Sequence, residues 1–409
     1  MPFSLSAAKP RLLIPLIASV QFTYILDFLL LLPLGPDVST ALQFPPAQLA
    51  WLTTAYTASS VLAGLFSIRY LDRINRKTGL LICFAALSLF TFLAGMATGL
   101  GSLLLARALT GIFGGLSVAL AMALVIDATP PERRGAAIGK VMIGISLALI
   151  AGVPAALELS RAGGWQLPFY CLGALGVLIC LLAAWLLPLE HEVTARQTST
   201  TSLPMLLKQP AVRIACLIQA GNQFSSFLII PIYSSFFVLN LSYPRAELGM
   251  LYLIGGLSAL MTMQVLGRLS DYIGPLKTAA LATAVVWLGL TPLLDFSLFA
   301  PMLAFVLFMS GSAGRNVSVA AACSKIPAPE QRAGFMALLN IVQDLGIVLA
   351  SLISAAMLSV ALEPVSPQAQ ALPLSGVPAL ALLALLAACV PLAGLAWLQR
   401  HQNQDLNRH

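Results

Sequence analysis

The sequence has few charged residues, which make up 9% of its 409 residues, whereas 59% are apolar. Its mean hydropathy of +0.92 excludes a water-soluble domain of this length. Several apolar runs reach about 18 residues, the length at which a helix rising 1.5 Å per residue crosses roughly 30 Å of hydrocarbon. Runs such as 172–187 lack the strict alternation of a membrane β-strand. The composition therefore predicts an all-α membrane protein.

The expected spans contain no histidine, and their cysteines are not clustered. The three histidines, His191, His401 and His409, fall in polar segments, so the spans offer no histidine for a metal site or a proton relay. The six cysteines lie in apolar runs without a CxxC pair and are interpreted as small packing residues. The sequence also lacks a Walker loop. We therefore expect no cofactor, no metal and no enzyme activity.

The apolar runs predict twelve transmembrane helices, the first of which is too long for a signal-peptide core. The spans are 12–34, 49–68, 78–98, 101–126, 136–157, 166–188, 211–239, 246–266, 276–296, 299–324, 334–361 and 376–398. Of the 22 lysines and arginines, 18 fall in the termini and in alternate loops, and only Arg161 and Arg245 fall in the opposite loops. The positive-inside rule then places both termini in the cytoplasm. The net charge of +7 is thus a topology signal and not evidence for nucleic acid.

The two halves of the chain echo each other. A Ser/Thr-rich polar stretch near the middle divides the spans six and six, and Pro33 and Pro231 differ by 198 positions. Asp72 and Asp271 differ by 199. We therefore predict two pseudo-symmetric six-helix bundles, residues 1–188 and 211–409, joined by a cytoplasmic linker at 189–210.

Several segments, in loops and in one span, carry recognisable motifs. Residues 68–77 keep the charges of a Gly-x-Leu-x-Asp-Arg-x-Gly-Arg-Lys turn, with Ile68 and Asn75 in place of its glycines, and the repeated segment 267–274 keeps both glycines. Residues 103–111, around Arg107, match a fourth-helix arginine motif. By these segments the whole chain resembles the major facilitator superfamily, near its twelve-helix bacterial drug and metabolite efflux branch.

The resemblance implies a function and a location. Members of this family are secondary active transporters that move a small-molecule substrate by alternating access, usually as monomers. For this chain it implies a multi-pass protein of the bacterial inner membrane. The antiporter motif of the fifth helix is present only in part, at residues 152–156.

Four charged residues lie at least six positions from either end of the predicted spans, in the bilayer core, where each costs at least about 2.5 kcal/mol. Counted along their helices, Asp27 and Arg107 both lie roughly 9 to 10 Å below the outer boundary and can pair. Arg315 and Asp344 lie at similar depths near the midplane and could form a second pair. Burial disfavours a charged carboxylate and a neighbouring guanidinium favours it, so Asp27 is a candidate proton switch. We predict proton-coupling roles for all four, with structural ion pairs as the alternative.

Two further spans carry polar stripes that predict a wet, substrate-binding face. The alternative is hydrogen bonding between helices. With a polar arc beside Asp27, the predicted substrate-binding residues are Gln21, Tyr24, Asp27, Gln219, Asn222, Gln223, Ser226, Tyr233, Asn340 and Gln343.

Charged residues also gather at the expected cytoplasmic helix ends. The resemblance implies that they form a gate that closes in the outward-open state, and the alternative is a solvated surface that sets topology. The predicted gating residues are Asp72, Arg73, Arg76, Asp127, Arg134 and Asp271.

These features together predict proton-coupled efflux, by antiport, of a small amphipathic or cationic compound or metabolite. Two alternatives remain open at this point. One is a proton- or sodium-coupled symporter that works in uptake, and the other is a non-transporting membrane receptor. Beyond the substrate and protons, the lipid bilayer is the only partner we expect.

Overall fold

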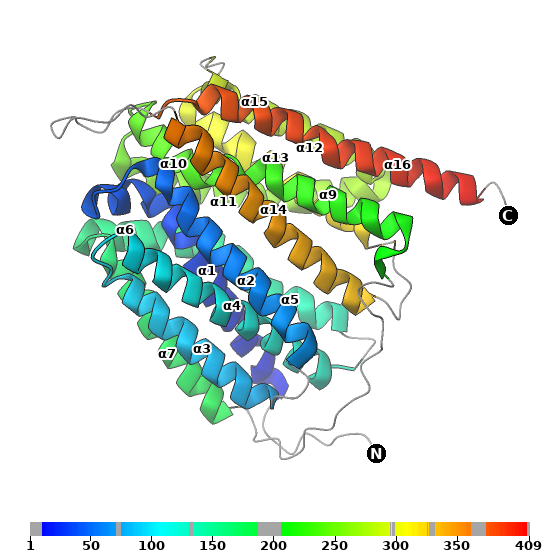
Figure 1. Cartoon of the computed structure of the whole chain (residues 1–409). Coiled ribbons are helices and arrows are strands. Elements are labelled where there is room, and N and C mark those ends of the chain that lie inside the picture. The colour runs from blue at the N-terminus through cyan, green and yellow to red at the C-terminus, as the bar shows by residue number, and fades with distance from the viewer. Residues whose placement is uncertain are drawn as a thin grey trace, which may run out of the picture. The chain divides into compact units, whose positions relative to one another are not determined.

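The computed structural model describes residues 10–70, 75–130, 134–186, 206–294, 296, 299–324, 326, 332–360 and 374–406. All regular elements within these ranges are helical (Figure 1). Eleven helical segments are long and apolar enough to span a membrane, and the shorter apolar helix Pro275–Gly289 makes a twelfth. The predicted all-α fold with twelve membrane helices is confirmed.

The chain divides into two compact units by its internal contacts. The first comprises Met1–Phe44 with Ala55–Arg196, and the second comprises Pro45–Thr54 with Gln197–His409. Most of the predicted linker, 189–205, lies outside the described residues. The predicted boundaries of the bundles therefore stay predictions.

The first unit contains the helices up to residue 186, except for the start of α2, which belongs to the second unit up to Thr54. A π-helical turn, Ala148–Gly152, joins α5 to α6 so that the two form one continuous span. The core of the unit gathers leucine, isoleucine, valine and phenylalanine side chains of α1, α3, α4, α5 and α7, among them Ile17, Phe84 and Val141. The helices are α1 (Pro10–Ala41), α2 (Leu49–Tyr70), α3 (Arg76–Ala94), α4 (Leu100–Ala128), α5 (Arg134–Leu147), α6 (Val153–Gly163) and α7 (Gln166–Leu186).

The second unit repeats this pattern with more interruptions. Its core packs side chains of α9, α12, α13, α14 and α16 around residues such as Val212 and Phe335. The elements are η1 (Pro46–Gln48), α9 (Pro210–Phe227), α10 (Ile230–Leu239), η5 (Arg245–Glu247), α11 (Leu248–Ile273), α12 (Pro275–Gly289), η6 (Thr291–Leu294), α13 (Pro301–Cys323), α14 (Arg332–Val360), α15 (Val377–Ala387) and α16 (Cys389–Leu406).

Equivalent prolines of the two halves act differently. Helix α1 continues through Pro33 and Pro36 to Ala41, seven residues beyond the predicted end at 34. In the second unit the helix breaks before Pro231, which is one of the first two residues of α10. A proline removes one backbone donor, and in a membrane its neighbours must satisfy the freed carbonyl group. Sequence spacing alone does not show which outcome follows.

Two turn residues explain how the motif segments fold. Asn75, which replaces a motif glycine, caps α3 by accepting a hydrogen bond from the Thr78 amide at 3.1 Å. Gly274 adopts φ +91° between α11 and α12, a conformation that strongly favours glycine. A capping asparagine thus takes the place of one glycine, while the repeated segment retains the glycine that its turn requires.

Candidate coupling and substrate sites

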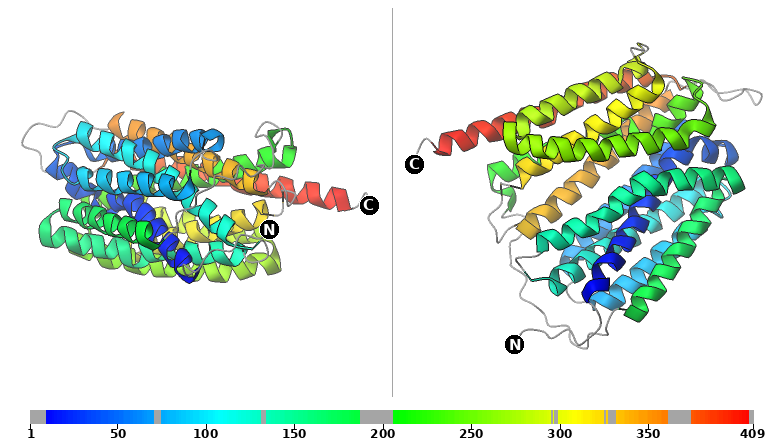
Figure 2. Two further views of the ribbon diagram at one scale, coloured as in Figure 1. Left: turned by 90° about the horizontal axis from the view of Figure 1, so that it is seen from below. Right: turned by 180° about the vertical axis from the view of Figure 1, so that it is seen from behind.

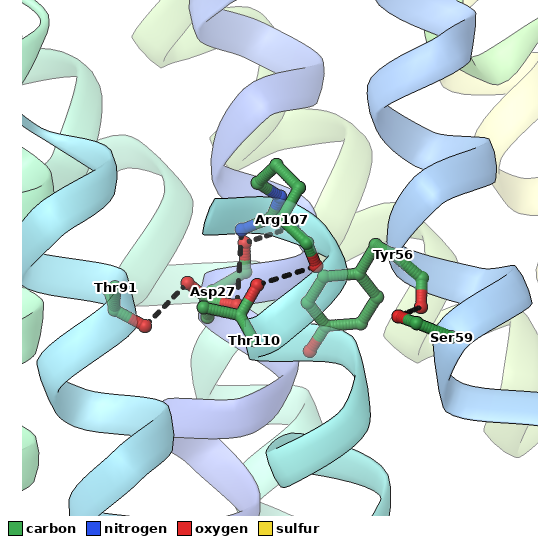
Figure 3. A network of polar contacts seen from close by, with 6 residues as sticks. All are labelled: Asp27, Tyr56, Ser59, Thr91, Arg107 and Thr110. Atoms are coloured by element: carbon green, nitrogen blue, oxygen red, sulfur yellow. Dashed lines mark hydrogen bonds and ion pairs between the residues drawn. The ribbon is translucent and has the colours of Figure 1, made fainter. Parts of the chain in front are cut away.

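The carboxylate of Asp27 lies at the centre of the first unit and is completely buried. Its Oδ2 accepts a hydrogen bond from Arg107 Nη1 at 3.1 Å, and its Oδ1 accepts one from the Thr91 hydroxyl at 2.8 Å (Figure 3). Arg107 Nη2 also donates to the backbone carbonyl of Asp27 at 3.1 Å. Helices α1, α3 and α4 therefore meet at one carboxylate, and the structure contains the predicted pair.

The guanidinium of Arg107 is as buried as its partner, with 1% of its surface exposed. Its Cζ lies 4.4 Å from the centre of the Tyr56 ring, which gives the cation a second, quadrupolar contact. The Thr110 hydroxyl donates to the Arg107 carbonyl at 2.9 Å and so stays within its own helix. An isolated charge would be expensive at this depth, and the pair together with the ring offsets that cost.

Sequence reasoning missed Thr91 and Tyr56. Thr91 is fully buried in a largely apolar run, and Tyr56 is one of several hydroxyl residues at 53–60, so neither position stands out in the sequence. Gly111 of the arginine motif and Gly114, which follows it, mark the close approach to Tyr56. A Cβ at Gly114 would lie 2.8 Å from the Tyr24 ring and 3.2 Å from the Tyr56 hydroxyl, and one at Gly111 would collide with the Tyr56 carbonyl. These glycines bring α4 close enough for Arg107 to reach the ring.

The polar stripe of α9 faces α13 and α14 within the second unit. Gln219 donates to the side-chain oxygen of Gln343 at 2.7 Å, and the Asn222 amide donates to Asn316. Gln223 is buried on the same helix. The structure therefore brings the predicted α9 and α14 residues together through side-chain amides, and adds Asn316, which the sequence reasoning did not single out.

Arg315, which was predicted to pair with Asp344, reaches α9 with its guanidinium. Its Nη2 donates to the Asn222 carbonyl at 3.2 Å and to the Ser226 hydroxyl at 2.7 Å. Among the described residues, Arg315 Nε and Nη1 have no hydrogen-bond partner. Equal depth sets the height of a side chain but not the side of the helix from which it projects. The pairing of Arg315 with Asp344 therefore stays a prediction, and the structure adds the contacts of Arg315 with α9.

Tyr233 lies apart from the polar stripe, in an aromatic cluster. Its hydroxyl donates to the Gly289 carbonyl at 3.2 Å. Its ring stacks on Phe305 at 5.4 Å and meets the edges of Phe237 and Phe308 at 5.0 and 4.8 Å. With 2% of its surface exposed, Tyr233 packs α10 against α12 and α13 in this conformation.

The remaining predicted substrate residues divide by helix. Tyr24 precedes Asp27 by three positions on α1 and lies near the same face, whereas Gln21, six positions before Asp27, lies about 120° around the helix. Tyr24 packs against Tyr56 at a ring-centre distance of 6.1 Å. On α14, Asn340 is exposed, while Asp344 is partly buried.

Among the predicted gating residues, one pair is in contact. Arg76 at the start of α3 forms an ion pair with Asp127 near the end of α4, and it donates to the Ala123 carbonyl at 3.3 Å. Asp271 is exposed in the last turn of α11. Asp72, Arg73 and the side chain of Arg134 lie outside the described residues.

The fold and these motifs agree with the comparison with known families. The model of the Major Facilitator Superfamily matches residues 17–351, so the chain belongs to this family. Its members are secondary transporters and not enzymes, and the chain is a multi-pass membrane protein of this family.

Bacterial relatives are distant. A "Probable sugar efflux transporter" of Helicobacter pylori strain ATCC 700392 / 26695 is 26% identical over 237 residues, which is 57% of this chain and 59% of that protein. A protein of the same name from Mannheimia succiniciproducens is 25% identical over 69% of this chain and 71% of its own length. The chain thus spans less than two thirds of the Helicobacter relative.

Solved structures support the fold alone. A bacterial homolog of the human lysosomal transporter Spinster, inward-facing and occupied, has a TM-score of 0.74 at 18% identity, covering 97% of this chain and 98% of its own. The nucleoside transporter NupG has a TM-score of 0.73 at 14% identity, covering 95% and 99%. At these identities the likeness carries no information on substrate.

Proposed function

We propose that the protein is a proton-coupled efflux transporter of a small polar metabolite, working by alternating access between its two helical bundles. The observation that carries the proposal is the fully buried pair of Asp27 and Arg107. A carboxylate held by one guanidinium and one hydroxyl can take up a proton when the guanidinium moves away. Such a group converts movement of a helix into proton release or uptake.

The pair is not a repeated structural element, which supports a functional role. At the repeat offset of 198, Asp27 corresponds to Ser225 and Arg107 to Phe305. Ser225 donates only to the Asn222 carbonyl of its own helix, and Phe305 packs in the aromatic cluster. The second unit therefore folds without a counterpart of this ion pair.

The proposed substrate site is the face of α9, α13 and α14 that is rich in side-chain amides. The side-chain amides of Gln219, Asn222 and Gln343 offer both donors and acceptors. Arg315 adds donors and a positive charge, which favours a solute rich in oxygen acceptors. The names of the two relatives support efflux and a hydroxylated solute such as a sugar.

The test is transport by purified protein in liposomes, with a pH-sensitive dye inside and a panel of sugars, sugar alcohols and cationic drugs. Asp27→Asn should abolish solute accumulation driven by a proton gradient, while solute exchange without a gradient persists. Asp37→Asn is the matched control, because Asp37 is a partly buried carboxylate on the same helix that accepts a hydrogen bond from Ser160 at 3.3 Å. That variant should transport normally.

Gradient-driven accumulation in Asp27→Asn would disprove coupling at this residue. Accumulation only when the gradient is reversed would favour the symport alternative. A wild type that moves no solute of the panel, in either direction, would count against transport of this solute class and favour the receptor alternative.

A further inference from the structure

A groove on the first unit is separate from the buried ion pair. It has a volume of about 1000 Å³, and its lining residues are Ile14, Pro15, Ala18, Ser19, Phe22, Lys140, Ile143, Gly144, Leu147, Leu175 and Ile179. Helix α1 forms its floor, α5 one wall and α7 the other. In the right-hand view of Figure 2, the first half of α1 runs between these two helices.

The hollow follows from small side chains on the floor and from one close crossing. A Cβ at Gly144 would collide with the Ala18 carbonyl, so α5 lies directly on α1 at this point. Beside the crossing, Ala18 and Ser19 leave space that larger residues would fill. The Ser19 hydroxyl donates to the Pro15 carbonyl at 3.0 Å and presents little polarity to the groove.

The walls are apolar and open to the surroundings. Ile143 and Leu147 are 61% and 51% exposed, and Leu175 is 37% exposed. In a protein whose helices span a membrane, side chains of this kind meet lipid chains. The groove is therefore suited to a hydrocarbon chain and not to a hydrated polar solute.

One end of the groove carries a charge. Lys140 is exposed, lines the groove and forms no ion pair with any residue that the structure describes. It is the second residue of the candidate span Gly139–Gly163, which places its amine at the edge of the hydrocarbon region. Seven residues further along, Leu147 lies about 10 Å deeper. An amine at the boundary followed by an apolar channel matches a phosphate followed by an acyl chain.

We propose that this groove binds an anionic phospholipid, with the phosphate of the headgroup at Lys140 and an acyl chain along Ile143 and Leu147. Basic pockets between membrane helices attract anionic headgroups, and one lysine near such a surface contributes about 1 kcal/mol. The loop before α5 is among those that the positive-inside rule assigns to the cytoplasm, so the lipid would come from the inner leaflet.

Native mass spectrometry of the purified full-length protein, titrated with phosphatidylglycerol and with phosphatidylcholine, tests the proposal. Lys140→Gln should weaken the first phosphatidylglycerol bound by about fivefold and leave phosphatidylcholine unchanged. Ser19→Leu, which fills the groove without changing charge, should weaken both lipids. Lys277→Gln is the control, because Lys277 is also an exposed lysine near the start of a membrane helix but does not line the groove.

Equal binding of the two lipids by the wild type would overturn the proposal, as would an unchanged phosphatidylglycerol affinity in Lys140→Gln. An effect of Lys140→Gln without any effect of Ser19→Leu would show that the headgroup binds but the chain lies elsewhere, which also contradicts it. Both variants change exposed or loosely packed side chains, and an unaltered thermal unfolding profile confirms that each is folded. If a transported solute competes with the lipid, the groove belongs to the substrate path instead.

Discussion

The carboxylate of Asp27 accepts hydrogen bonds from α3 and from α4, and the one from α3 can be removed without touching the ion pair. Thr91→Val keeps the shape of the side chain and deletes its hydrogen bond to Oδ1. We expect a loss of about 1 kcal/mol in the free energy of unfolding, because the bond is buried and its acceptor is charged. Thermal unfolding in detergent should show a lower Tm.

Thr110→Val is the control for this substitution. Its hydroxyl is equally buried but donates to a carbonyl of its own helix, at Arg107. Such back-bonding contributes little to helix stability, so the Tm should hardly change. Equal losses in the two variants would mean that Thr91 stabilises the unit by packing and not through Asp27.

Sequence reasoning identified the partner of Asp27 but did not foresee the contacts of Arg315 with α9. Depth along the helix was the criterion in both cases. It is a partial criterion, since the end of α1 from which Asp27 was counted extends seven residues further, to Ala41. The direction of a side chain around its helix depends on packing, and for Arg315 packing selects Ser226 and a carbonyl of α9. Deeper knowledge of the repeat would not have revealed this, because neither pair is repeated.

At the scale of helices, the approach of α4 to α2 depends on Gly111. A methyl group there would meet the Tyr56 carbonyl, which belongs to backbone and cannot rotate away. We expect Gly111→Ala to lower the free energy of unfolding by about 1–3 kcal/mol, because overpacking strains the helix contact. The Tm of the purified protein should fall accordingly. Because Tyr56 lies over Arg107, the same change should also reduce coupled transport.

Gly101→Ala on the same helix separates crowding from helix propensity. A Cβ at Gly101 would meet nothing within 4 Å. Alanine reduces the entropy of the unfolded chain, so this variant should be neutral or more stable by up to about 1 kcal/mol. A destabilised Gly101→Ala would indicate that α4 tolerates no alanine for reasons other than packing.

The amide face of α9 gives a prediction on substrate affinity. Gln219→Ala removes the donor to Gln343 and should raise the KM for solute exchange by about three- to tenfold, as the loss of one or two hydrogen bonds would. The number of protons moved per solute should not change, because Asp27 keeps its partners.

Gln264→Ala is the matched control, since Gln264 is an exposed glutamine of α11. Its KM should equal that of the wild type. A shift in proton stoichiometry in Gln219→Ala, with an unchanged KM, would move the amide face from substrate binding to coupling.

At the scale of the whole molecule, the number of membrane helices could be predicted because the length of each apolar run is a property of the sequence alone. The direction in which each helix crosses is predicted in the same way, from the charges of the loops. What the sequence leaves open is where each span bends. Pro231 interrupts its helix and Pro33 does not, although the two are equivalent in the repeat. The difference arises from the neighbours that satisfy the freed backbone groups, which a linear pattern does not encode.

The distribution of basic residues predicts how the helices are oriented in the membrane. Since 18 of 22 basic residues lie in one set of loops and termini, both termini should face the cytoplasm. In a variant whose six cysteines are replaced, single cysteines at Thr98 and Ala246 should react with a membrane-impermeant maleimide in intact cells. Cysteines at Lys208 and Tyr272 should react only after permeabilisation. All four positions are exposed in the structure. The reverse pattern would place the Lys140 end of the groove in the outer leaflet, and labelling of all four in intact cells would mean that the protein inserts in both orientations.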